Sequence, residues 1–202
     1  MSNATPRIPS RDGEPAWEAA YLLPLQGRWS EEDFLRFHST QMAELVNGRL
    51  EILPMPNLKH QKLLKMLLGL VEAAAPPQSL VLFAPLPTTL FPGTIREPDL
   101  LYISPDNLPA KDAEYPTKID LAMEIVSDGT EARKRDYEDK RQDYAKARVA
   151  EYWIVDPRDQ VVVVLVLKGE EYVEQGRFVP GQIANGQLLT NLIVDVAALM
   201  RA

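Results

Sequence analysis

The sequence predicts an α/β fold, of the α+β kind in which helices pack on a central mixed β-sheet. Three observations predict it. Two long stretches carry apolar side chains at helical spacing, several short apolar runs are bounded by proline or glycine, and one apolar run, Val161–Leu167, is unbroken. Helical and strand patterns interleave along the chain, which is typical of helices packed on a sheet.

Length and composition predict one domain with an N-terminal extension. The chain has 202 residues, of which 46% are hydrophobic and 25% charged, so it can bury a substantial core. Residues 1–27 contain four prolines and no sustained apolar period, so we expect them to form a partly disordered extension. Residues 28–202 are then the folded domain.

The first half of that domain predicts two helices and a hairpin. Ser30, followed by three acidic residues, is a helix-start signal for a short helix that ends near His38. The pair Asn47-Gly48 predicts a tight turn in the hairpin Ala43–Pro54. Apolar side chains at helical spacing predict a second helix over His60–Ala75, ended by two prolines.

The second half predicts the sheet and its remaining helices. Four short apolar runs separated by prolines predict strands at Leu80–Ala84, Thr88–Phe91, Asp99–Ile103 and Asp120–Val126. After them we expect a helix from Asp128 to about Arg148, strands at Tyr152–Val155 and Val161–Leu167, and a short helix from Asp195 to Arg201. Because Val161–Leu167 has no polar interruption, it is typical of a strand buried on both faces.

Composition also excludes several classes of protein. The absence of cysteine excludes disulfides, Cys-ligated zinc, iron–sulfur clusters and thiol nucleophiles. Serine-triad and P-loop motifs are absent. A net charge of −7 means that any DNA contact must be local or depend on a cation. With no secretory signal and no apolar run near the ~20 residues of a membrane helix, we expect a cytoplasmic protein.

Two carboxylates stand out in the predicted strands. Asp99 follows a proline, a position that by itself is typical of an ordinary loop or strand start, and Glu124 lies in an apolar run that should be buried. A buried carboxylate needs a cation beside it. Two carboxylates about 4 Å apart repel by roughly 4 kcal/mol at an effective dielectric of 20. A divalent metal reverses that sign, and Mg²⁺ prefers such oxygen ligands.

The following helix supplies cations. Asp136, Lys140 and Tyr144 share one helical face, which is either functional or a solvated face with an Asp–Lys pair. Residues 131–148 hold seven basic and five acidic residues in a protein that is acidic overall. Its first cations, Arg133, Lys134 and Arg135, either contact DNA phosphates or belong to a solvated helix start.

Pro98-Asp99 followed by Glu124 in an apolar strand resembles the signature of the PD-(D/E)xK nuclease superfamily. The ordinary signature has a lysine two residues after the second acid, where this chain has Val126. The longer pattern resembles one branch, the Uma-type restriction endonuclease family, over about residues 30 to 200. The positions that carry this resemblance are Glu44–Gly48, His60, Pro98-Asp99, Glu124–Ser127, Asp136, Lys140, Tyr144 and Glu151–Asp156.

The resemblance implies a restriction-endonuclease-like core and hydrolysis of DNA phosphodiester bonds that depends on Mg²⁺ or Mn²⁺. It implies that Asp99 and Glu124 bind the metal through their carboxylates, with the carbonyl of Ile125 as a third ligand. It also implies that the lysine has moved from the strand to the following helix, so that Lys140 positions the attacking water.

Further roles remain open between a functional and a structural alternative. Glu44 either holds a second metal or a metal-bound water, or is a surface charge on the hairpin. His60 either contacts a phosphate or water, or faces solvent at its helix start. Asp136 is expected to hold Lys140 in place. Tyr144 is a candidate for substrate binding, as are His60, Arg133 and Lys134, although a packing role with a polar tip suits Tyr144 better.

Three functions follow from these observations. The first is a metal-dependent DNA endonuclease, and its alternative is a non-catalytic nuclease-fold module that binds nucleic acid or a protein partner. The third is a metal-dependent hydrolase of other phosphate esters. Because a two-strand cut needs two sites, we also expect a homodimer, with Val161–Leu167 or the hairpin at its interface.

Overall fold

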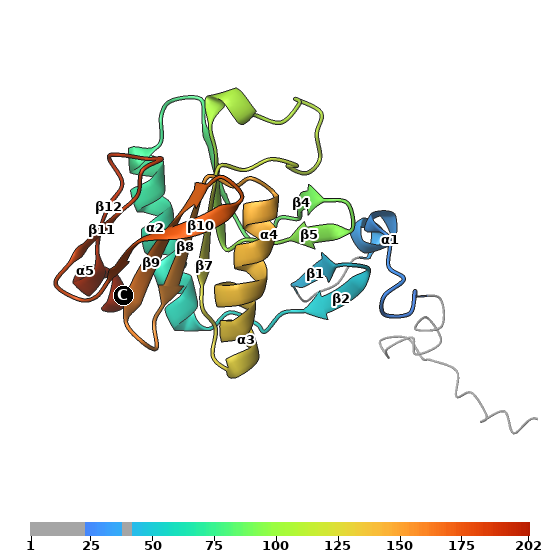
Figure 1. Cartoon of the computed structure of the whole chain (residues 1–202), viewed down its shortest axis with the longest axis horizontal. Coiled ribbons are helices and arrows are strands. Elements are labelled where there is room, and N and C mark those ends of the chain that lie inside the picture. The colour runs from blue at the N-terminus through green and yellow to red at the C-terminus, as the bar shows by residue number, and fades with distance from the viewer. Residues whose placement is uncertain (1–22, 38–41) are drawn as a thin grey trace, which may run out of the picture.

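A six-stranded mixed sheet organises the computed structural model, which describes residues 23–37 and 42–202 (Figure 1). The strand order is β10-β9-β8-β7-β6-β3, in which β7 and β8 are parallel and the other neighbours are antiparallel. This confirms the predicted α/β fold with a mixed sheet. The strands are β3 (Leu80–Phe83), β6 (Leu100–Ile103), β7 (Leu121–Ile125), β8 (Glu151–Asp156), β9 (Val161–Lys168) and β10 (Glu171–Phe178).

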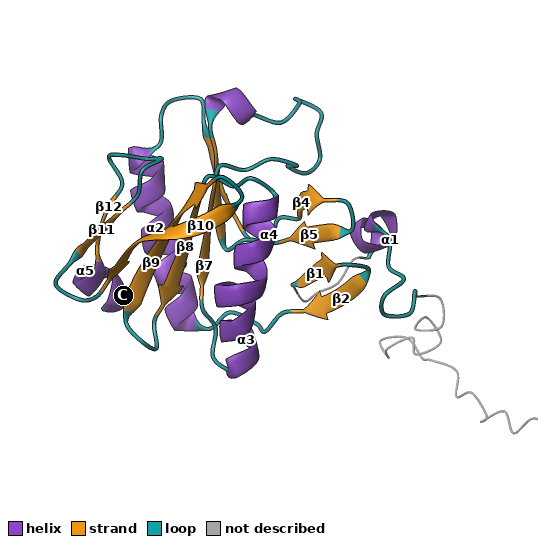
Figure 2. Cartoon of the chain, in the orientation of Figure 1, coloured by secondary structure: helices purple, strands orange, loops and turns teal. Residues whose placement is uncertain are grey.

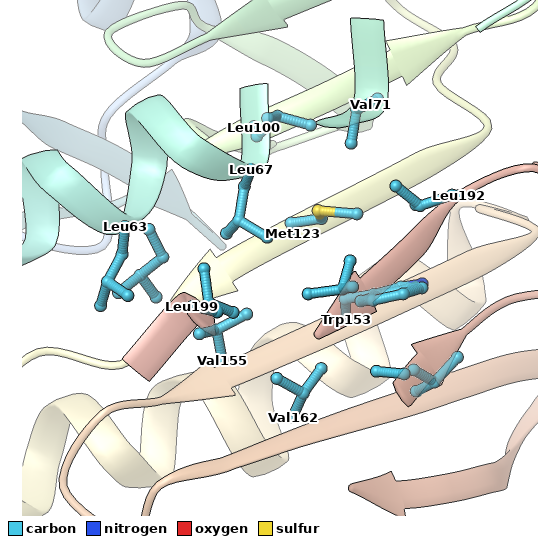
Figure 3. Close-up of a cluster of buried hydrophobic side chains, with 14 of the residues drawn as sticks. Leu63, Leu67, Val71, Leu100, Met123, Trp153, Val155, Val162, Leu192 and Leu199 are labelled. Carbon is cyan, nitrogen blue, oxygen red and sulfur yellow. The ribbon is translucent and has the colours of Figure 1, made fainter. Parts of the chain in front are cut away.

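Helix α2 (Leu58–Ala74) covers one face of this sheet, and α5 (Val196–Met200) packs beside it (Figure 2). Leu63, Leu67 and Val71 on α2 meet Met123 and Trp153 on the sheet, as Figure 3 shows. The helix begins two residues before the predicted start because Asn57 caps it, accepting a hydrogen bond from the N–H of His60.

A second helical segment covers the opposite face. It consists of α3 (Thr130–Lys134), a π-helical turn (Arg135–Asp139) and α4 (Lys140–Lys146), close to the predicted helix over residues 128–148. Side chains alternate along β7, so that Met123 faces α2 whereas Ala122 belongs to the core under α4. By the same alternation Glu124 faces α4, which decides where the site forms.

A smaller four-stranded sheet lies beside α4, with the order β2-β1-β5-β4 (Figure 1). The Asn47-Gly48 turn joins its first two strands as predicted, with φ of 50° and 74° at the two turn residues. Helix α1 (Glu31–Arg36), which Ser30 caps, packs Phe34 against the apolar face of this sheet. The strands are β1 (Ala43–Val46), β2 (Arg49–Ile52), β4 (Thr88–Phe91) and β5 (Thr94–Arg96).

Several elements differ from the prediction. Helix α1 ends at Arg36, not near His38, and Thr88–Phe91 joins the smaller sheet. The sequence did not predict β5, β10, or the pair β11 (Ile183–Asn185) and β12 (Ile193–Asp195). Strand β10 is an edge strand in which half of the residues are exposed. It lacks an apolar run and forms through pairing with β9.

Strand β9 pairs with β8 on one side and β10 on the other, and Val161 to Val166 are buried. It is therefore buried on both faces, as predicted, and Val161–Leu167 is not available as a dimer interface. The other predicted interface, the hairpin, stays a prediction. Most of the expected extension, residues 1–22, lies outside the described residues. Of its remaining part, Gln26 exchanges two hydrogen bonds with the backbone of Leu50 on the hairpin. In the part of the chain that the structure describes, no helix is long and apolar enough to cross a membrane.

Candidate active site

Asp99 and Glu124 come together where the two sheets meet. Asp99 follows β5 and precedes β6, and its Oδ2 accepts a hydrogen bond of 2.7 Å from the backbone N–H of Ile125. The same oxygen lies 3.1 Å from Nε2 of His60 at the start of α2. Because Ile125 directly follows Glu124, the backbone contact holds both carboxylates at one end of β7.

Lys140 enters the site from the helical segment. Its Nζ lies 2.8 Å from Oε1 of Glu124 and 3.0 Å from Oε1 of Glu44, and all three side chains are buried. Oδ1 of Asp136 is 3.9 Å from the same ammonium. Tyr144 donates a 2.6 Å hydrogen bond to Oε1 of Glu124. The predicted shared face of Asp136, Lys140 and Tyr144 is therefore confirmed, and it faces the acids rather than solvent.

Arg96 joins the smaller sheet to α4. From the end of β5 it donates hydrogen bonds of 2.7 Å to Glu44 and of 3.0 and 2.6 Å to Asp143 on α4. Glu44 also accepts a 3.0 Å hydrogen bond from the backbone N–H of Glu97. Each carboxylate oxygen of Glu44 thus has a cation or a backbone donor, which fixes its position next to Lys140.

The buried acids differ in the direction of their pKa shifts, which is downward for Glu44 and upward for Glu124 and Asp136. Burial by itself raises the pKa of Glu44, but Lys140 and Arg96 outweigh burial and hold the pKa at about 2. Burial raises the pKa of Glu124 to about 8, since Lys140 offsets it only in part and Asp99 repels the charge. Burial also raises the pKa of Asp136, to about 6. The site therefore holds more carboxylates than its own cations neutralise.

A small cavity of about 30 Å³ lies between these groups. It is lined by Met42, Leu53, Pro54, Pro56, His60, Glu97, Asp99, Glu124, Ile125, Ser127, Arg135, Asp136 and Lys140. A cavity of this size holds about one water molecule. It adjoins two wider clefts, of about 310 and 510 Å³, which share lining residues with it. Any larger reactant must therefore lie in the clefts and reach into the cavity.

For three of the predicted site residues, the structure excludes one of the two roles that the sequence left open. Glu44 is fully buried, so the hairpin surface charge is excluded. His60 is only 9% exposed, so it does not simply face solvent. Tyr144 is fully buried under the sheet and bonded to Glu124, so its assignment to substrate binding is wrong.

Two basic residues of the helical segment that we expected to contact DNA phosphates, Arg133 and Lys134, do not line the cavity. Arg133 forms ion pairs with Asp156 at the end of β8 and with Asp159 in the β8–β9 turn, and Lys134 is exposed. Their neighbour Arg135 instead lines the cavity, with its Nε 3.6 Å from Asp136.

The motif positions Glu151 and Asp156 have structural roles. Glu151 accepts hydrogen bonds from the Trp153 indole and from two backbone N–H groups in the loop at residues 187–188. Asp156 accepts the backbone N–H groups of the β8–β9 turn. Both residues hold loops in place beside the sheet, and neither of them lines the cavity.

Two buried residues of the site were not predicted, Arg96 and Glu97. Glu97 lines the cavity, its Oε2 has no hydrogen-bond partner, and burial raises its pKa to about 7. The available signal was a charged pair directly before Pro98-Asp99, in a segment between two apolar runs. Such a pair needs partners when it is buried.

Two carboxylates at the cavity have acceptor oxygens that a divalent cation could use. Within residues 23–37 and 42–202, no three His, Asp or Glu side chains already lie close enough together to hold a metal ion, and Lys140 lies between Glu44 and Glu124. However, Oε2 of Glu97 and Oδ1 of Asp136 are buried without a hydrogen-bond partner beside the cavity. Hard carboxylate oxygens with unused acceptor capacity are the ligands that Mg²⁺ and Mn²⁺ prefer.

Comparisons with known proteins identify the family and the fold of the chain. The family model Uma2, described as "Putative restriction endonuclease", matches residues 31–197. Among solved structures, the chain is similar to a putative nuclease belonging to DUF820 from Anabaena variabilis, with a TM-score of 0.72 and 20% identity. That match covers 88% of this chain and 98% of the other, and it shows a shared fold. No curated protein matches the sequence. Since the family model spans most of the chain, the protein belongs to the Uma2 family of restriction endonuclease-like proteins.

Proposed function

We propose that this protein is a metal-dependent endonuclease that hydrolyses phosphodiester bonds in DNA. The observation that carries the proposal is the contact between Lys140 and Glu124, in a cavity that Asp99 also lines. An acid pair can hold a metal ion that assists phosphodiester hydrolysis, and an adjacent lysine can stabilise the charge that develops on the phosphate. The residue two positions after Glu124, Val126, packs in the apolar core, and Lys140 brings the ammonium from the helix instead.

Asp99, Glu124 and the carbonyl of Ile125 are the groups that would hold the metal. When bound, Mg²⁺ or Mn²⁺ would lower the pKa of water and neutralise charge that develops on phosphate oxygens. Glu97 and Asp136 are further carboxylates at the same cavity.

The chain's own residues have separable tasks in this proposal. Lys140 donates a hydrogen bond to the attacking water and offsets negative charge near the phosphate. Glu44, itself held by Arg96, keeps the ammonium of Lys140 in position. The backbone N–H of Ile125 and the ring of His60 orient the carboxylate of Asp99, as outer-shell groups do around metal ligands.

Cleavage of plasmid and of labelled linear DNA, with Mg²⁺ or Mn²⁺ and with chelator, tests the proposal. We expect cleavage by the wild type only when metal is present. Asp99→Asn, Glu124→Gln and Lys140→Met should each lose about a hundredfold or more in rate. The matched control is Asp112→Asn, at an exposed loop acid, which should cleave like the wild type.

A thermal-unfolding titration runs beside the assay. Metal at 100 times its dissociation constant stabilises the folded state by about 2.7 kcal/mol, which is about 5 to 10 °C for a chain of this size. This shift should vanish in Asp99→Asn. A wild type that binds metal but cleaves no DNA would overturn the endonuclease and favour the binding module. Hydrolysis of small phosphodiesters alone would favour the third function.

A further inference from the structure

A cleft of about 310 Å³ opens beside the cavity, between the start of α2 and the turn from β8 to β9. Pro54, His60, Ile125 and Ser127 line both the cleft and the cavity, so the two are continuous. The other lining residues are Met55, Asn57, Lys59, Val126, Asp128, Pro157 and Arg158. A DNA strand with its reacting phosphate at the cavity can therefore place its neighbouring nucleotide in one of the adjoining clefts.

The charges differ between the two clefts. Lys59 and Arg158 line this one, both are exposed, and within the described residues neither forms an ion pair with an acid. The Nζ of Lys59 lies 3.4 Å from the carbonyl of Pro157, across the cleft. Asp128 is the one carboxylate among the lining residues of this cleft. The other cleft is lined by Asp128 and Glu131 against Arg135 alone.

The start of α2 adds a second attraction for anions. The helix spans 17 residues, and its cap, Asn57, takes the backbone N–H groups of His60 and Gln61. The N–H groups of the first two helical residues have no acceptor within the helix, and the positive end of the helix dipole lies there. His60, which lines both the cleft and the cavity, is nine-tenths buried, and its Nδ1 has no hydrogen-bond partner.

We propose that this cleft is the subsite for the DNA phosphate next to the scissile one, bound by Lys59, Arg158 and the start of α2. The proposal rests on the proposed function, because it takes the cavity as the place of cleavage. It also sets a direction, because the DNA strand then leaves the cavity over the start of α2. The more acidic cleft, which shares Pro54 and Asp128 with this one, is not its path. Met55, at the rim and 69% exposed, is an apolar surface for the sugar between the phosphates.

Equilibrium binding to a fluorescein-labelled DNA duplex, with Ca²⁺ in place of Mg²⁺ to prevent cleavage, tests the subsite. The variants are Lys59→Ala and Arg158→Ala, and the matched control is Lys65→Ala, an exposed lysine further along the same helix. We expect each cleft variant to raise Kd about tenfold, the effect of losing one charge-assisted contact. Each should also reduce the slope of log Kd against log salt by about 1. Lys65→Ala should bind like the wild type.

The outcomes separate this proposal from the proposed function. If both cleft variants keep the wild-type Kd and salt slope, the subsite is wrong even when the protein cleaves DNA. If they weaken binding but the wild type cleaves no DNA, the endonuclease fails and the cleft is a DNA-phosphate site without a scissile neighbour. A wild type that does not bind the duplex overturns the subsite. Because both side chains are exposed, unchanged thermal unfolding of the variants will show that a binding loss is local.

Discussion

The ammonium of Lys140 lies 2.8 Å from the carboxylate of Glu124, although the two side chains come from different elements. Strand β7 carries the acid, and the helical segment that follows it crosses back over the same face to deliver the lysine. The π-helical turn directly before Lys140 lies within this crossing. The contact therefore depends on the packing of the helix against the sheet.

Lys140→Met should destabilise the folded protein in metal-free buffer. The change leaves Glu44 and Glu124 buried without their shared ammonium, which costs about 3 to 5 kcal/mol in comparable cases. Urea unfolding of the wild type and the variant measures this loss. Lys134→Met, at an exposed lysine earlier in the same segment, should change stability by less than about 0.5 kcal/mol. Equal stability of wild type and Lys140→Met would contradict the buried ion pairs.

His60→Ala should weaken metal binding at the site. The ring orients the carboxylate of Asp99, and losing such an outer-shell partner costs about tenfold to hundredfold in metal affinity. The midpoint of a Mn²⁺ titration, followed by thermal unfolding, gives the affinity. The exposed neighbour Gln61→Ala serves as the control. A midpoint for His60→Ala that matches the wild type would remove the histidine from the site.

Glu97 makes the stability of the metal-free protein depend on pH. Its pKa is raised from 4.5 to about 7, mainly by burial, so the folded state binds its proton more tightly than the unfolded state. The resulting stability is fully present below pH about 4.5 and is lost as pH rises through about 7.

Glu97→Gln should remove this part of the pH dependence. Unfolding free energies measured by urea at several pH values between about 4.5 and about 8 compare the variant with the wild type. The exposed acid Glu114, changed to Gln, is the control and should leave the profile unchanged. A wild-type profile with the same slope as that of Glu97→Gln would show that the carboxyl group is not buried.

Tyr144→Phe should lower stability without changing DNA affinity. The hydroxyl donates to the buried carboxyl group of Glu124, and removing one partner of a buried hydrogen bond costs about 1 to 3 kcal/mol. Since the ring is buried under the sheet, the duplex should bind the variant as it binds the wild type. Thermal unfolding and the binding assay measure the two effects, with Tyr115→Phe as a control. A loss of affinity with unchanged stability would return Tyr144 to the substrate-binding residues.

Local patterns in the sequence were sufficient to predict many of the helices, strands and turns. The Asn47-Gly48 turn, the helix over residues 58–74 and the shared face of Asp136, Lys140 and Tyr144 each depend on residues a few positions apart. The unbroken run of β9 likewise predicted its own burial. Edge strand β10 escaped prediction because pairing with β9, and not its own composition, makes it a strand.

The sequence by itself determined the fold class, the family resemblance and the pairing of Asp99 with Glu124 as the acids to examine. Only the tertiary structure decided that Glu44 is a buried partner of Lys140, that Tyr144 is internal, and that Arg96 and Glu97 belong to the site. The physical reason is distance along the chain. Arg96 and Glu97 bind Glu44 across 52 and 53 residues of sequence, and such contacts exist only after both sheets and the helical segment have packed together.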